Sequence, residues 1–239
     1  MSAPKNPGRV AGLWYLALVL LGPLRLIYIP ETLFVTGNAT ATADNIAAHE
    51  WLFRSGMVDD LIAAVVLVYL TLVFYRLFED VDQHLAVLVV ILGGVMPGLL
   101  YFVNVATDES VLAIVRGADY LSVFDKPQRD ALAMLLLRQH SHLNTAAETL
   151  WGLWLIPLGM LVFRSHFLPR FLGVWLLING VAYVLLSFTG ELMPQYSDKA
   201  FLLAQPALFG EIALTLWLVI RGSRPTPRSR YAAEASLQM

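Results

Sequence analysis

The sequence predicts an all-α membrane protein, a polytopic transmembrane bundle of about six helices with a helical outer-side element between the third and fourth. Of the 239 residues, 58% are hydrophobic and only 14% are charged, and the mean hydropathy is +0.65. Soluble domains carry about 25% charged residues. The 16 Lys and Arg and 18 Asp and Glu residues could not keep the surface of a soluble chain of this size polar. This composition excludes a soluble enzyme, a disordered protein and a nucleic-acid-binding protein.

Six stretches of the chain are long and apolar enough to cross a membrane, since a helix needs about 20 mostly apolar residues to span the hydrocarbon core. Each is expected to be helical, because a single strand would leave its backbone groups without hydrogen-bond partners in lipid. The six stretches are 10–29, 57–77, 85–106, 146–163, 168–188 and 200–220. We expect one transmembrane domain over residues 1–222, followed by a flexible basic cytoplasmic tail over 223–239.

The basic residues between these stretches predict their orientation, because cytoplasmic loops carry an excess of Lys and Arg. With the N-terminus in the cytoplasm, the two short outer loops contain only Arg54 and Lys199. The cytoplasmic segments then contain Lys5, Arg9, Arg76, Arg164, Arg170, Arg221, Arg224, Arg228 and Arg230. We therefore expect a multi-pass protein of the cell membrane with both termini in the cytoplasm.

The connection between the third and fourth stretches, residues 107–139, is long and falls on the outer side in this orientation. It contains two apolar clusters, 111–115 and 120–124, and Asp125 can cap a helix that has Pro127 in its first turn. We expect an interfacial or re-entrant helical element that packs over the outer mouth of the bundle. The alternative is a pair of short amphipathic helices that lie on the lipid headgroups.

Ionisable side chains inside membrane helices are costly, so each one is a candidate functional residue. Five lie away from the cytoplasmic helix ends, and they are Arg25, Asp59, Asp60, Glu148 and Glu211. Four carboxyl groups would then share one arginine, and such a charge in a low dielectric would not persist without a bound cation or protonation. We expect Arg25 to pair with Asp59 or Asp60, and favour Asp60 as the one that faces the interior.

Further polar residues share helix faces with these groups, since residues four apart stack on one side of a helix. His140, Asn144 and Glu148 form one such row, and Asn179 and Tyr183 belong to another. In the expected orientation these groups gather in the outer half of the bundle and predict an outward-facing polar pocket. The candidate ligand-binding residues are Arg25, Asp59, Asp60, Asn104, His140, Asn144, Glu148, Asn179, Tyr183 and Glu211.

Three functions fit this pattern. The first is the binding of a small molecule or cation in the outward-facing pocket, with the lipid bilayer as the other partner. The second is an intramembrane metal-dependent hydrolase that uses the same acids with His140 or His142 as metal ligands. The third is a non-catalytic membrane scaffold or regulatory subunit, in which the polar groups only hold helices together. The residues alone identify no catalytic group and no cofactor, and the chain contains no cysteine.

Four segments of the chain also resemble a known bacterial membrane family. They are RVAGLWYL at 9–16, EWLFRSGMVDD at 50–60, RSHFLPRFLG at 164–173 and GEIALTLW at 210–217. In order and spacing they are similar to the family named domain of unknown function 4386, over roughly residues 9–222. The resemblance implies a small prokaryotic inner-membrane protein with about six helices. It implies no activity, so it transfers no catalytic residue to this sequence.

Overall fold

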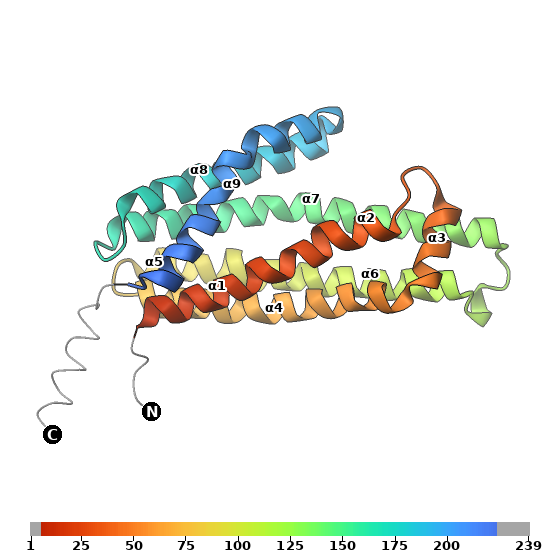
Figure 1. Cartoon of the computed structure of the whole chain (residues 1–239), viewed down its shortest axis with the longest axis horizontal. Coiled ribbons are helices and arrows are strands. Elements are labelled where there is room, and N and C mark those ends of the chain that lie inside the picture. Colours follow the sequence, from red (N-terminus) through yellow and green to blue (C-terminus); the bar gives the residue numbers. More distant parts are fainter. Residues whose placement is uncertain (1–5, 224–239) are drawn as a thin grey trace, which may run out of the picture.

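The protein is a bundle of long helices, shown in Figure 1 as a computed structural model that describes residues 6–223. Within these residues there are no strands, and six helical segments are long and apolar enough to cross a membrane. Each overlaps one of the six predicted stretches, so the predicted fold class is confirmed and the chain is a multi-pass membrane protein. The predicted tail over 223–239 lies outside the described residues from 224 onward.

The six segments differ in how regular they are. The first is α1 (Pro7–Pro23), a π-helical turn η1 (Leu24–Tyr28) and α2 (Ile29–Leu33), and the third is α5 (Gln83–Val90), a second π-helical turn η2 (Ile91–Val95) and α6 (Met96–Arg116). The second is α4 (Glu50–Phe78), the fourth α7 (Lys126–Arg164) and the fifth α8 (Arg170–Leu192). The sixth is a 3₁₀ turn, η4 (Pro194–Tyr196), followed by α9 (Ser197–Ile220). A shorter helix, α3 (Ala39–Ala48), lies between the first and second segments.

Both ends of the described chain lie at the same end of the bundle (Figure 1). Side-chain hydrogen bonds tie them together. Asn6 Nδ2 donates to the Ser223 carbonyl at 3.2 Å, and the Ser223 amide donates back to Asn6 Oδ1 at 3.1 Å. Arg9 Nη2 donates to the carbonyl of Ile220 at 3.1 Å, one of the carbonyls that the end of a helix leaves without an internal partner. The first and last membrane segments are therefore closed against each other at this end.

An aromatic core fills the bundle near this end. The rings of Tyr15 on α1, Phe74 on α4 and Trp154 on α7 are all buried, and their centroids are 5.8 to 6.4 Å apart in each pair. Buried leucines of α7, α8 and α9 surround them. Because lipid is as apolar as these side chains, close packing rather than the hydrophobic effect holds the helices here.

Helices α7 and α8 approach each other most closely at two pairs of glycines. A Cβ added to Gly180 would lie 2.7 Å from the carbonyl oxygen of Gly152, and one added to Gly173 would lie 2.7 Å from that of Gly159. Only a residue without a side chain allows these backbones to meet. The two glycines of each helix are seven residues apart, so they recur on one face of each helix. This contact fixes α8 against α7 and leaves α9 to pack on α8 and α1.

The connection expected over 107–139 is helical, as predicted, but it consists largely of the continuations of α6 and α7 rather than of a separate element over the mouth of the bundle. Only residues 117–125, with the 3₁₀ turn η3 (Asp119–Leu121), lie between the two helices. The cap predicted at the start of α7 is present: Asp125 accepts from the Gln128 amide at 2.9 Å, and the Gln128 side chain accepts from the Asp125 amide at 3.0 Å. At 1.5 Å per residue, α7 is about 58 Å long, nearly twice the thickness of the hydrocarbon core.

The parts of α6 and α7 that exceed the membrane thickness form a helical extension with α2, α3 and the start of α4, at the end opposite the termini (Figure 1). The extension has its own apolar core, with Ile46, Phe53 and Leu112 fully or almost fully buried. Ion pairs cover it, such as Lys126 Nζ to Asp44 Oδ1 at 2.9 Å. A polar surface over a separate core is what a water-facing segment needs.

Candidate functional site

The two π-helical turns border the centre of the bundle. A π-helical turn inserts an extra residue and redirects the side chains around it, and such turns are frequent at functional sites. Each is followed by a proline near the start of the next helix, Pro30 after η1 and Pro97 after η2, and proline removes a hydrogen bond from the preceding turn. The turn η1 carries Arg25 and directs this buried side chain inward, and η2 brings Gly93 to the same region.

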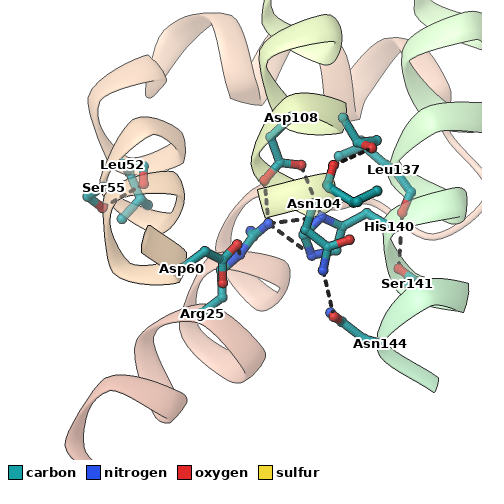
Figure 2. Close-up of polar contacts among 12 residues, drawn as sticks. Arg25, Leu52, Ser55, Asp60, Asn104, Asp108, Leu137, His140, Ser141 and Asn144 are labelled. Carbon is teal, nitrogen blue, oxygen red and sulfur yellow. Dashed lines mark hydrogen bonds and ion pairs between the residues drawn. The ribbon is translucent and has the colours of Figure 1, made fainter. Parts of the chain in front are cut away.

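Arg25 is the centre of a buried polar cluster, which Figure 2 shows. Its Nε donates to Asp60 Oδ2 of α4 at 2.8 Å, and its Nη2 donates to Asp108 Oδ2 of α6. The same Nη2 lies 2.9 Å from Nε2 of His140 on α7. The side chains of Asp60 and Asp108 are only 2% and 1% exposed. Four helical segments thus meet at one guanidinium, and of the two aspartates expected as partners of Arg25, Asp60 is the one that it contacts.

His140 completes this cluster by linking Arg25 to Asp108 a second time. Its Nδ1 lies 3.2 Å from Asp108 Oδ1. Both ring nitrogens of His140 also lie near Arg25 Nη2, Nδ1 at 3.1 Å and Nε2 at 2.9 Å, whereas Asp108 Oδ1 has no hydrogen-bond partner among the described residues. One ligand atom each from Asp60, Asp108 and His140 lie within 4.8 Å of one another, which is compatible with a metal ion. The guanidinium of Arg25 is already bound to all three residues.

A pair of amides lies directly beside the Arg25 cluster. Asn104 Nδ2 on α6 donates to Asn144 Oδ1 on α7 at 2.9 Å (Figure 2). Asn104 precedes Asp108 by one helical turn, and Asn144 follows His140 by one turn, so the amide pair and the Arg25 cluster occupy the same two helix faces. The Asn104 Oδ1 atom is buried and has no hydrogen-bond partner among the described residues. This unpaired acceptor adds to the polar character of the region.

A second polar centre surrounds Glu211 on α9. Tyr15 of α1 donates a hydrogen bond to Glu211 Oε1, and Tyr183 and Asn179 of α8 lie near the same carboxyl group. Asn179 Nδ2 donates to the carbonyl of Leu208 at 3.3 Å. The carboxyl group of Glu211 therefore has polar neighbours on both α1 and α8. Tyr15 lies ten residues before Arg25, so the two polar centres are about 15 Å apart along α1.

A cavity of about 240 Å³ connects the two centres. Its charged lining residues are Arg25, Asp59, Asp60 and Glu211. Its aromatic lining residues are Tyr15, Tyr101, Trp151, Trp154 and Tyr183. The remaining wall is mostly aliphatic and comes from α1, η1, α4 and α9. A mostly apolar cavity with a few convergent polar groups is the usual form of a small-molecule site.

The ten residues that the sequence singled out divide into three groups. Arg25, Asp59, Asp60, Tyr183 and Glu211 line the cavity. His140, Asn104, Asn144 and Asn179 do not line it. His140 contacts Arg25, Asn179 donates to the carbonyl of the lining residue Leu208, and Asn104 and Asn144 hydrogen-bond to each other. Glu148, in contrast, is half-buried on α7 and does not line the cavity. His142, an alternative metal ligand in the hydrolase hypothesis, is exposed.

Sequence reasoning missed two groups of the site. Asp108 was assigned to the outer connection, although it lies four residues after Asn104 and so continues the same helix face. Tyr15 gives no comparable signal, because it is not charged and an aromatic residue in a membrane helix usually belongs to the packing. Its partner Glu211 is 196 residues away in the sequence, so no spacing within one helix could indicate their hydrogen bond.

Comparison with known proteins identifies the family. Residues 10–222 match the family described as "Domain of unknown function (DUF4386)". A 74-residue stretch is 30% identical to a protein of Archaeoglobus fulgidus whose name is "Uncharacterized protein". That alignment covers 31% of this chain and 43% of the relative, so it spans less than half of the relative's length. No solved structure matches the chain. The match over residues 10–222 shows that the chain belongs to this family, as its sequence resemblance implied.

Proposed function

We propose that this member of the DUF4386 family binds a small cationic molecule in the cavity between Arg25 and Glu211. The observation that carries the proposal is the charge of the cavity wall, where three carboxyl groups accompany one guanidinium. Arg25 is already bound to Asp60 and to Asp108 behind the wall. Asp59 and Glu211 therefore remain as acidic groups that can face a ligand of opposite charge.

The neutral part of the wall also suits a cation. Tyr15, Tyr101, Trp151, Trp154 and Tyr183 supply aromatic rings, and the face of such a ring attracts an ammonium group that has left water. At about 240 Å³ the cavity is slightly smaller than the range of about 300 to 1,000 Å³ that is common for drug-sized ligands. A small ammonium compound fits both the volume and the chemistry.

We also propose the membrane orientation that the sequence predicts, with both termini in the cytoplasm. Arg9, Arg164, Arg170 and Arg221 lie at the end of the bundle where the termini meet, which by the excess of basic residues is the cytoplasmic end. The Arg25 cluster then faces outward. Because the chain has no cysteine, single cysteines can be introduced at Ser122 and at Asp80, an exposed residue in the turn between α4 and α5, and treated with a membrane-impermeant maleimide in whole cells. Labelling at Ser122 but not at Asp80 is expected, and the reverse pattern would contradict the orientation.

Binding can be tested with tetramethylammonium as the probe. Purified protein in lipid nanodiscs is titrated by calorimetry, together with Asp59→Asn, Glu211→Gln and the control Glu31→Gln, whose side chain lies on α2 outside the cavity. Loss of one carboxylate from the wall is expected to weaken binding at least tenfold, whereas the control should bind as the wild type does. Binding that is absent in the wild type, or equal in all four proteins, would refute the proposal.

A metal centre is the second candidate, because Asp60, Asp108 and His140 place three ligand atoms within 4.8 Å. Their oxygen and nitrogen donors fit a divalent cation such as zinc, which could activate water in a hydrolase. Arg25 competes for the same atoms. Metal analysis of the wild type and of Arg25→Met decides whether these ligand atoms bind a metal ion or only Arg25. Stoichiometric metal, with lower stability after chelation, would support the metal centre, and a metal-free protein in both cases would eliminate it.

The scaffold hypothesis makes the opposite prediction for the carboxyl groups. If Glu211 and Asp59 only hold helices together, their amide variants should change thermal stability. Neither the wild type nor the variants should then bind tetramethylammonium. The titration above therefore distinguishes the scaffold from the binding protein. The hydrogen bond from Tyr15 to Glu211 is compatible with both hypotheses, so thermal stability alone does not decide between them.

A further inference from the structure

The cavity has one boundary where two of its lining residues are also exposed on the outside of the bundle. Leu26 of η1 is 50% exposed and Ile212 of α9 is 39% exposed, and both line the cavity. Gly22 of α1 lines it as well, and a Cβ placed there would have no neighbour within 4 Å. At this boundary between α1 and α9, the inner wall of the cavity has open space, and side chains that line the cavity are also exposed on the outer surface.

The course of α9 explains why this boundary is open. Near the termini α9 is closed against α1, where Gly12 meets the backbone of Leu218 and Val219. Farther along, α9 runs beside α8 and diverges from α1 (Figure 1). Trp175 Nε1 of α8 donates to the carbonyl of Pro206 at 3.0 Å, and so ties this half of α9 to α8. The two halves of α9 thus have different neighbours, and the opening lies beside the half that has left α1.

The opposite route, along the bundle axis toward the extension, is blocked by the Arg25 cluster. Arg25, Asp60, Asp108 and His140 are all buried, and they link α4, η1, α6 and α7 through direct contacts. Water or a water-borne ligand would have to separate these ion pairs to pass. Breaking a buried ion pair is costly. The boundary beside Gly22 requires no such separation.

We infer that ligands enter the cavity sideways from the lipid, through the opening beside Gly22 between α1 and α9, and that the ligand is an amphipathic amine. The inference rests on the proposed binding function. The ammonium head lies among Asp59, Glu211 and the aromatic rings. The hydrocarbon tail extends along Leu18, Leu21, Leu26, Leu208 and Ile212 toward the lipid. Apolar surface on the route and acidic groups at its end select a molecule that has both parts.

Two probes with the same head test the ligand class. Tetramethylammonium and dodecyltrimethylammonium differ only in the tail, and both are titrated into protein in nanodiscs with empty nanodiscs as the blank. The tailed probe is expected to bind at least tenfold more tightly than the tailless one, because its tail remains in an apolar environment on the route. Equal affinities for the two probes would overturn the assignment of an amphipathic ligand.

The route itself is tested by filling the open space at Gly22. Association of dodecyltrimethylammonium is followed by stopped-flow tryptophan fluorescence, since Trp151 and Trp154 line the cavity. Gly22→Phe, and the smaller Gly22→Leu, should slow association at least tenfold. The control Leu20→Phe adds the same ring on the same helix at a site that is 70% exposed, and should stay within twofold of the wild type. Melting temperatures confirm that all variants fold.

The outcomes separate this inference from the function on which it rests. If Gly22→Phe binds as fast as the wild type, while Asp59→Asn and Glu211→Gln still lose binding, the lipid-side route is wrong and the binding site stands. If the wild type binds neither probe, both proposals are refuted. A slow Gly22→Phe with an unchanged Leu20→Phe supports entry through this opening.

Discussion

Replacement of Arg25 by methionine removes the one cation from a cluster that contains two nearly inaccessible aspartates. Methionine keeps most of the volume of the side chain, so the main change is the loss of charge and of the contacts to Asp60, Asp108 and His140. Loss of one partner from a buried ion pair costs about 3 to 5 kcal/mol, because the other charge stays buried without compensation. We expect Arg25→Met to lower the free energy of unfolding by about this amount.

An exposed ion pair of similar length provides the control. Arg164 Nη1 lies 2.9 Å from Asp82 Oδ2, but these side chains are 50% and 26% exposed, and such surface pairs contribute about 0 to 1 kcal/mol. Unfolding is followed by circular dichroism during titration of mixed micelles with sodium dodecyl sulfate. Arg25→Met/Asp108→Asn should recover part of the loss, because it removes one uncompensated carboxylate. Equal losses in Arg25→Met and Arg164→Met would refute the reasoning.

Two further predictions concern the fold around the site. Gly159→Leu should destabilise the bundle by about 1 to 3 kcal/mol, because a Cβ at this position lies 2.8 Å from the Gly173 carbonyl oxygen and forces α7 from α8; the same titration measures it, and wild-type stability would contradict the close packing. Asp125→Ala should cost about 1 kcal/mol through loss of the N-cap of α7. Hydrogen exchange should then speed up at the start of α7 and not near Arg164, and a uniform change would speak against a local cap.

The membrane segments could be predicted because hydropathy is a local property of the sequence. A run of about 20 apolar residues must become a helix in lipid, whatever its neighbours are. The ends of α6 and α7 could not be predicted in this way, because both helices continue beyond the apolar runs into charged sequence. There the signal is the four-residue spacing of Asn104, Asp108 and Leu112, which are all buried on one face of α6. The charged neighbours Asp108 and Glu109 made that segment resemble a loop.

Site residues were predictable on one helix and not across helices. His140 and Asn144 were correctly placed on one face, since four residues turn an α-helix through about 400° and leave the second side chain only about 40° from the first. Glu148 is eight residues from His140, and the deviation doubles to about 80°. The α7 residues that do line the cavity, Trp151 and Trp154, lie by the same count about 20° and 40° to either side of the His140 direction, so this rotation turns Glu148 away from the cavity wall. The partners of Arg25, in contrast, depend on how four helical segments pack together. The spacing of residues within one helix carries no information about that packing.

Arg25 connects two parts of the molecule that otherwise have separate cores. Through Asp60 it contacts a residue of the cavity wall, and through Asp108 and His140 it contacts the helices that continue into the extension. A cation that binds near Asp59 and Asp60 repels the guanidinium and competes for Asp60, so it weakens the contact that Arg25 makes on the cavity side. Arg25 is then held mainly by its contacts with Asp108 and His140. Two of the three partners of Arg25 therefore belong to α6 and α7 at the base of the extension, so this one guanidinium joins the cavity wall to the extension.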